Sequence, residues 1–185
     1  MRTNRAGQSA LLLLDVIEIL RREKIDYVVI GAFALSAHAV VRASSDVDAL
    51  LHISYARLTK LSSMFESAGF TTTLCSGDAD DPILGMLVLG DSHGNQVDLL
   101  GGLRGLDPKV FSRAMEVTFL NKILRIVGRE DFIAMKCFAG GPQDVADARS
   151  AYQAAQGPVD LDLLRTTTRR FGRDAADKLE EVLAQ

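Results

Sequence analysis

Three aspartates in two apolar segments are the residues best suited to chemistry in this chain. Asp46 and Asp48 stand two residues apart in the segment DVDALL, and Asp98 stands in a second apolar segment, QVDLL. Residues i and i+2 of a β-strand face the same side. If the two segments are neighbouring strands, the three carboxylates converge. Such an all-oxygen ligand set suits Mg²⁺ or Mn²⁺, and two such ions can activate a hydroxyl and stabilise a leaving pyrophosphate.

A D-x-D pair alone also occurs on the solvated face of an edge strand, so the pair needs support from its surroundings. Gly31 gives that support, because it ends the apolar run 27–30 and opens a helix of small residues. A helix N-terminus offers free N–H groups and a positive dipole end to a phosphate, and glycine lets the phosphate approach the backbone. A phosphate seat leading to a metal-binding strand is the layout that nucleotidyl transfer needs.

The segment YVVIGAFALSAHAVVRASSDVDALL resembles the minimal-nucleotidyltransferase signature of the DNA-polymerase-beta-like superfamily. That signature is a strand, a Gly-Gly or Gly-Ser pair, a helix, a D-x-D strand and a third carboxylate on a later strand. Here Gly31-Ala32 is followed by thirteen residues and then by Asp46-Val47-Asp48. The sequence of this segment is most similar to the branch of AbiEii-type toxins. Ala32 departs from the usual Gly or Ser, so a phosphate contact there must come from the backbone alone.

Two further matches extend the resemblance to about residues 25–150. Arg42 and Ser44 fall where the family's Arg and Thr stand. The segments IAMK and AGGPQDVAD resemble the family's second block, in which a helix bearing a lysine, here Lys136, precedes a K/Q-D-x-x-D helix. The resemblance implies catalytic and metal-binding roles for Asp46, Asp48 and Asp98. It implies nucleotide contacts for Gly31, Ala32, Arg42, Ser44 and Lys136.

The implied activity is transfer of a nucleoside monophosphate from a nucleoside triphosphate, with Mg²⁺ or Mn²⁺, to a hydroxyl of RNA, protein or a small molecule. A toxin-type enzyme with an antitoxin partner belongs to the same expectation. Two alternatives stay open. Lys136 could form an ion pair with Asp144 or Asp147 instead of contacting nucleotide. The whole chain could also be an inactive nucleotide- or protein-binding module that kept the fold.

The surrounding pattern predicts an α+β protein with the nucleotidyltransferase fold, in which a mixed sheet is flanked by helices and followed by a C-terminal helical extension. Apolar periodicity predicts elements of both kinds. The expected helices are 9–24, 32–41, 56–68, 129–139, 142–156, 160–170 and 173–183. The expected strands are 27–30, 46–53, 70–75, 85–89, 95–100, 117–120 and 122–127. We expect a core over residues 1–127 and a helical region over 128–185 that packs on it.

Composition narrows the possible classes of protein. The chain has 185 residues, 48% of them hydrophobic, which is ample for a folded core. Its net charge of −3 gives no overall basic field for nucleic acid, although four arginines within 165–173 could face an RNA backbone. Two cysteines cannot form a disulfide scaffold and suggest a reduced, cytoplasmic protein. No stretch is apolar enough for a membrane span, and the P-loop motif is absent.

Overall fold

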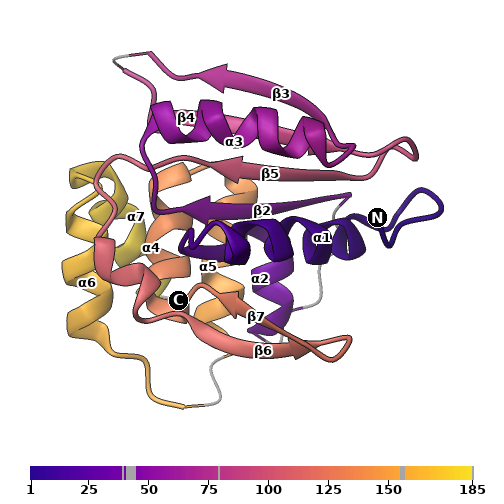
Figure 1. Cartoon of the computed structure of the whole chain (residues 1–185). Coiled ribbons are helices and arrows are strands. Elements are labelled where there is room, and N and C mark those ends of the chain that lie inside the picture. The colour runs from indigo at the N-terminus through magenta and orange to yellow at the C-terminus, as the bar shows by residue number, and fades with distance from the viewer. Residues whose placement is uncertain (39, 41–44, 79, 155–156, 185) are drawn as a thin grey trace.

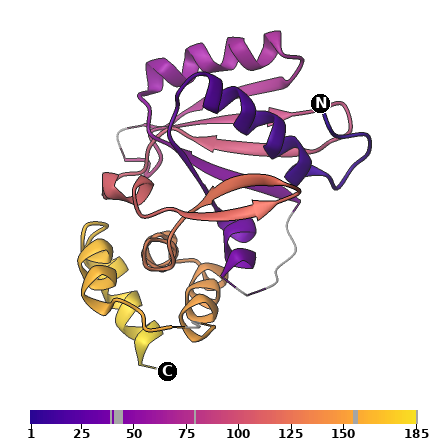
Figure 2. The same ribbon diagram turned by 60° about the horizontal axis from the view of Figure 1, so that its bottom comes forward.

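A computed structural model describes residues 1–38, 40, 45–78, 80–154 and 157–184, in which a seven-stranded sheet lies between two layers of helices (Figures 1 and 2). The strands are β1 (Tyr27–Ile30), β2 (Asp46–Leu51), β3 (Thr71–Ser76), β4 (Gly85–Gly90), β5 (Gln96–Leu100), β6 (Met115–Phe119) and β7 (Lys122–Ile126). The helices are α1 (Ser9–Arg22), α2 (Gly31–Ala37), α3 (Tyr55–Ser67), α4 (Arg129–Ala139), α5 (Pro142–Gln153), α6 (Leu161–Arg169) and α7 (Arg173–Leu183).

The sheet is mixed, with the strand order β3-β4-β5-β2-β1-β7-β6. β2 pairs in parallel with β5, and β1 pairs in parallel with β7, while the other neighbours are antiparallel. The predicted strands 85–89 and 95–100 are present as β4 and β5, which form an antiparallel hairpin. This topology places the D-x-D strand in the middle of the sheet, directly beside the strand that carries Asp98.

Helices cover both faces of the sheet. α1 and α3 lie on one face, and α2 lies with the four C-terminal helices on the other (Figure 2). Val47, Ala49, Val97 and Leu99 are buried under the first layer, as alternation along β2 and β5 requires. The aspartates of the same strands therefore face the second layer. One apolar cluster runs from Leu12 in α1 to Val182 in α7, so the C-terminal helices share the core.

Local signals explain most of the helix boundaries. α1 buries the face formed by Leu13, Val16, Ile17 and Leu20, as its apolar spacing predicts. α4 ends at Gly140, whose φ of 67° is the left-handed conformation that terminates helices. Pro142 then occupies the first turn of α5, where it removes no hydrogen bond.

The helix that follows β1 ends earlier than predicted. α2 ends at Ala37 rather than at residue 41, because His38 leaves the helix and turns its ring into the core. Its Nε2 lies 3.0 Å from the carbonyl oxygen of Val127. The α+β architecture with a C-terminal helical extension is otherwise as the sequence predicts. Within the described residues, no helix combines the length and apolar character needed to cross a membrane.

Candidate active site

The parallel pairing of β2 and β5 brings the predicted carboxylates to one face of the sheet. Asp48 is directly opposite Asp98 in the register, and Asp46 is opposite Gln96. Side chains of directly paired residues on adjacent strands stand about 4.5–5.5 Å apart at their β-carbons. The pairing of the D-x-D strand with the third carboxylate, inferred from the sequence as a condition of the site, is therefore present.

Asp98 has an environment that disfavours its charge. Burial raises the pKa of its carboxyl, the Gln96 side chain opposes that shift, and the charge of Asp46 raises the pKa further. The Gln96 amide Nε2 donates to Asp98 Oδ1 at 2.8 Å. The other oxygen, Oδ2, is not held by this bond. Repulsion from Asp46 means that a cation between the acids would stabilise the charged form of Asp98.

The three acids do not form a preassembled metal cluster. In the part of the chain that the structure describes, no group of three or more His, Cys, Asp and Glu side chains is arranged to hold an ion. The Asp48 carboxylate leans towards Gly31, whereas Asp98 is bonded to Gln96.

Gly31 is required by Asp48. Its φ is 67°, and a β-carbon at this position would lie inside van der Waals contact of Asp48 Oδ2 and 3.1 Å from Asp48 Cγ. Only glycine accepts both the backbone angle and the neighbour. Ala32 follows with a buried side chain, so it presents backbone alone, as its residue type predicts. Arg42 and Ser44, the other predicted nucleotide contacts, lie outside the described residues.

A cavity of about 710 Å³ opens beside Asp48. Ile30, Gly31 and Asp48 form its floor at the sheet, and α4 forms one wall. The other wall comes from two connections, and the residues that line it are Asp80, Pro82, Ile83, Leu103 and Arg104. A mostly apolar concavity with a few charged groups is the usual form of a small-molecule site.

Lys136 lies in this cavity, but as part of an ion-pair group. Its Nζ is 2.7 Å from Asp144 Oδ1 and 3.0 Å from Asp147 Oδ2. The ammonium is also 5.8 Å from the centre of the Phe132 ring. The ion pair considered at the level of the sequence is therefore present with both acids. Lys136 and Asp144 both line the cavity, so Lys136 is also within reach of a ligand there. A contact between Lys136 and nucleotide stays a prediction.

Sequence reasoning missed the part of the cavity wall that comes from the turn after β3. Residues 76–82 have the composition of a solvated turn, yet Asp80 and Pro82 line the cavity. An isolated bridge between Ile83 and Leu103 joins this turn to the connection after β5. No local pattern marks that contact, because both partners are single apolar residues in turn-rich segments. Leu103 and Arg104, from the Gly-rich connection after β5, also line the cavity.

Three of the four arginines of the C-terminal segment contact other groups of the fold. Arg165 pairs with Glu180 at 2.9 Å, and Arg173 lies 3.7 Å from Asp177. Arg170 donates to the carbonyl oxygens of Gly105 and Leu106. These contacts make the cluster a structural part of the helical region, and RNA binding by it stays an untested hypothesis.

Comparison with solved structures identifies the architecture. The antibiotic-resistance factor ANT(2'')-Ia superposes with a TM-score of 0.60 at 15% identity, over 96% of this chain and 97% of that one. This chain has a nucleotidyltransferase fold. An antigenic nucleotidyltransferase-like protein from Paracoccidioides brasiliensis shares it, with a TM-score of 0.51, 14% identity and coverage of 99% and 96%.

A second antibiotic-modifying protein also shares the nucleotidyltransferase fold. The lincosamide antibiotic adenylyltransferase LnuA, in a structure with lincomycin bound, matches with a TM-score of 0.51 and 12% identity, over 83% of this chain and all of that one, 100%. No protein-family model matches the sequence, and no curated protein matches it. At these identities the likeness establishes the nucleotidyltransferase fold, and the chemistry must be argued from the site.

Proposed function

We propose that this chain transfers a nucleoside monophosphate from a nucleoside triphosphate to a hydroxyl of a small molecule and releases pyrophosphate. The observation that carries the proposal is the position of Asp48. It pairs with Asp98 across the strands, lies against Gly31 at the start of α2 and lines a cavity of about 710 Å³. The Asp48 carboxylate, a helix start and a cavity of small-molecule size therefore meet at one point, while Asp46 and Asp98 are not among the residues that line the cavity.

The chain's own groups have distinct roles in this reaction. The backbone amides of Gly31 and Ala32 would bind the triphosphate at the start of α2, with Lys136 supporting it from α4. The acceptor oxygen attacks the α-phosphorus, the bond from that phosphorus to the pyrophosphate oxygen breaks, and the acceptor hydroxyl loses its proton. Asp98 would help to take that proton, through Oδ2, because Oδ1 accepts the Gln96 amide.

The donor set fits Mg²⁺ or Mn²⁺. Asp46, Asp48 and Asp98 offer carboxylate oxygens only, and the raised pKa of Asp98 reflects in part the neighbouring charge of Asp46. A divalent cation bound by these residues would supply the positive charge that polarises the phosphoryl group and neutralises the leaving pyrophosphate. We expect such an ion to draw the Asp48 and Asp98 carboxylates together.

The size and lining of the cavity favour a small acceptor. About 710 Å³ lies in the range of drug-sized ligand sites. Among the structural neighbours, LnuA is described with lincomycin bound, and ANT(2'')-Ia in complex with adenylyl-2''-tobramycin has a TM-score of 0.56 at 14% identity. An RNA or protein acceptor and a toxin-type role with an antitoxin partner stay predictions of the sequence resemblance. The cytoplasmic location, which the two cysteines suggested, and the division into residues 1–127 and 128–185 also stay predictions.

A catalytically inactive binding module is the second candidate. One observation favours it: Asp144 and Asp147 neutralise Lys136, so the wall of α4 offers a nucleotide no unbalanced positive charge from that residue. In such a module the nucleotide would bind without reaction.

Radiolabelled transfer separates the two candidates. Wild-type protein would be incubated with each α-labelled nucleoside triphosphate, Mg²⁺ and either tobramycin, lincomycin or the small-molecule fraction of a cell extract. We expect a labelled acceptor with wild type and none with the Asp46→Asn/Asp48→Asn double variant. Glu66→Gln, on the opposite helical layer, is the control and should retain labelling. Absence of label with wild type, together with equal nucleotide affinity in wild type and double variant, would favour the binding module.

Thermal unfolding tests the cation independently of activity. A ligand that binds only the folded state stabilises it by RT ln(1 + [L]/Kd), about 1.4 kcal/mol at ten times Kd. We therefore expect Mg²⁺ or Mn²⁺ to raise the Tm of wild type and not that of the Asp46→Asn/Asp48→Asn variant. Equal Tm shifts in both proteins would place the cation elsewhere.

A further inference from the structure

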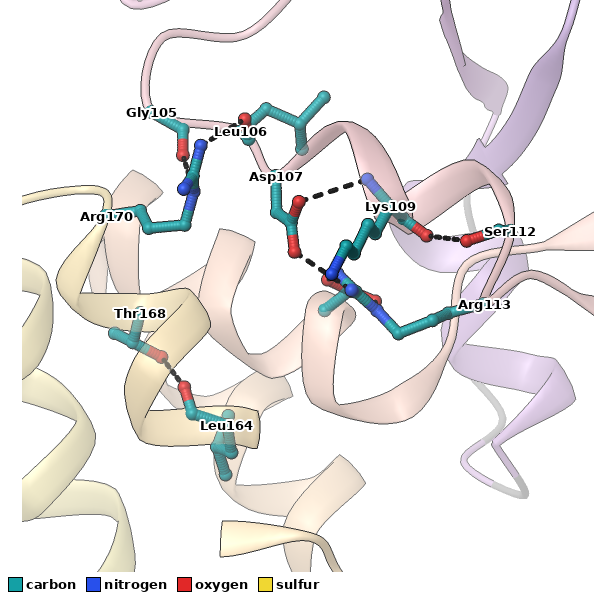
Figure 3. Close-up of polar contacts among 10 residues, drawn as sticks. Gly105, Leu106, Asp107, Lys109, Ser112, Arg113, Leu164, Thr168 and Arg170 are labelled. Carbon is teal, nitrogen blue, oxygen red and sulfur yellow. Dashed lines mark hydrogen bonds and ion pairs between the residues drawn. The ribbon is translucent and has the colours of Figure 1, made fainter. Parts of the chain in front are cut away.

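The corner between α6 and α7 contacts both walls of the cavity. This corner, residues 170–172, follows the last turn of α6 and lies beside the connection that leaves β5 (Figure 3). The connection carries Leu103 and Arg104 into the cavity wall. Residues of the C-terminal region therefore contact the connection after β5 on the side away from the cavity.

Arg170 fastens the connection through its backbone. Its Nε donates to the carbonyl oxygen of Gly105 at 3.3 Å, and its Nη2 donates to that of Leu106 at 3.4 Å (Figure 3). The backbones themselves are also in contact. Gly105 has φ 81°, and a β-carbon there would lie 2.6 Å from the carbonyl oxygen of Arg170. The connection thus fits against the corner only with glycine at position 105.

Phe171 fastens the opposite wall. Its ring stacks on Phe138 of α4, with ring centres 4.8 Å apart and an interplanar angle of 18°. Phe138 lines the cavity. Offset stacking of this kind contributes beyond simple burial. Two consecutive residues of the corner therefore hold the two walls, Arg170 the connection and Phe171 the helix.

A second arginine joins the same two walls farther along the connection. Arg113 forms two bonds to Asp131 of α4, at 2.7 and 2.6 Å, and a third to Asp107 at 2.9 Å. Asp131 is 2% exposed, so this pairing is buried at α4. Figure 3 shows Asp107 and Arg113 beyond the Arg170 contact. The connection is consequently anchored at 107 by Arg113 and at 105–106 by Arg170, and the cavity-lining stretch before Gly105 is bonded to Pro82 and Ile83 on its other side.

We propose that the α6–α7 corner is a positioning element for the acceptor: Arg170 and Phe171 set the separation of the connection from α4, and so select which acceptors the cavity admits. This inference rests on the proposed transfer reaction. It assigns no substrate contact to Arg170, which acts through Leu103 and Arg104. The C-terminal helices then position the cavity walls without contacting the substrate.

The first test compares two glycines with nearly equal φ angles. Gly105→Ala adds a methyl against the Arg170 carbonyl, whereas Gly94→Ala, with φ 77°, adds one where nothing lies within 4 Å. Both variants carry the same strain from a positive φ. We expect faster amide hydrogen exchange at residues 101–106 in Gly105→Ala and unchanged exchange there in Gly94→Ala. Equal exchange in the two variants would contradict the positioning contact, whether or not the protein is active.

The second test separates positioning from general stability. Arg170→Ala removes both carbonyl contacts, and Arg173→Ala, whose side chain is 91% exposed, is the matched control. With tobramycin or lincomycin as the probe acceptor, we expect Arg170→Ala to raise the acceptor KM roughly fivefold, the change that one modest hydrogen bond gives. The KM of the nucleotide and kcat should stay near wild type. Arg170→Lys, which can donate to one carbonyl, should recover part of the change.

The outcomes distinguish this inference from the proposed function. Loosened exchange at 101–106 with an unchanged acceptor KM would overturn the selectivity role. Parallel changes in both KM values and kcat would show a structural role only. If wild type transfers nothing while Gly105→Ala and Arg170→Ala still loosen 101–106, the transfer reaction fails and the contact between corner and connection stands.

Discussion

The carboxylate of Asp48 lies against the α-carbon of Gly31, in the space that a side chain at position 31 would occupy. This relationship joins the end of β1 to the D-x-D strand at the point where the cavity begins. The absence of a side chain at Gly31 therefore leaves room for the Asp48 carboxylate. A phosphate bound at the same glycine would contact its backbone amide.

Replacing Gly31 by alanine should abolish activity. The new methyl would displace the Asp48 carboxylate, and the φ of 67° would strain the backbone. We expect loss of nucleotidyl transfer by at least about 100-fold, as displacement of a catalytic group by an ångström can cost that factor. Gly94→Ala, with a similar φ of 77° and open space, should keep near-normal activity. Comparable losses in the two variants would mean that backbone strain, and not Asp48, is responsible.

Asp98→Asn should stabilise the protein and inactivate it. The folded-state pKa of Asp98 is raised, by burial first and by Asp46 in addition. Its charge therefore costs stability above the folded pKa, and the cost disappears as the pH falls below the ordinary value of 3.8. At neutral pH we expect a higher Tm than that of wild type, because asparagine carries no charge to desolvate, with transfer reduced by about 10²–10⁴-fold.

Asp107→Asn is the contrasting variant for that measurement. Burial acts to raise the pKa of Asp107, but the Lys109 amide and Arg113 outweigh it and the pKa is lowered. Its charge thus contributes stability above the ordinary pKa, and this contribution is lost as the pH falls through the folded pKa. Asp107→Asn should lower the Tm at neutral pH. A fall in Tm for Asp98→Asn as well would show that the charge of Asp98 is not a cost in the folded protein.

Lys136→Met should destabilise the fold whatever the role of Lys136 towards nucleotide. The change leaves Asp147, whose side chain is 3% exposed, without this cation. We expect a loss of about 1–3 kcal/mol in chemical denaturation, the cost of a desolvated polar group that loses a partner. Lys122→Met is the control, because its pair with Glu18 is about half exposed, 46% and 49%, and such pairs contribute under about 1 kcal/mol.

Nucleotide affinity of the same variant then tests the second role. If Lys136 also supports the triphosphate, its removal should weaken nucleotide binding beyond what Asp144→Asn does. Unchanged affinity in folded Lys136→Met would restrict Lys136 to the ion-pair group with Asp144 and Asp147.

His38 should make stability depend on pH below neutrality. Burial lowers the pKa of His38, against the opposing effect of its bond to the Val127 carbonyl. The unfolded chain takes up a proton near the ordinary value of 6.5, so stability present above that pH is lost as the pH falls below it. Each pH unit costs up to about 1.4 kcal/mol until the folded pKa is reached. Denaturation of His38→Gln should show a flatter profile between pH 5 and 7; a slope equal to wild type would assign the dependence to other groups.

The sequence predicted the elements well because their signals are local. α4 and α7 begin and end at the expected residues, since a glycine or proline stands at their boundaries and a 3.6-residue period marks their apolar faces. The common face of Asp46 and Asp48 follows from the period of two in a strand. The position of Gly31, between a strand and a helix, was also predicted from the end of the apolar run.

Tertiary structure decided how those elements meet. The register that sets Asp48 opposite Asp98, the neutralisation of Lys136 by two acids and the contact of Arg170 with Gly105 all join residues that no short-range pattern relates. Residue type and spacing define which side of a strand or helix a group occupies. Which group it then faces depends on packing of the whole core, because that packing fixes strand register and helix position together.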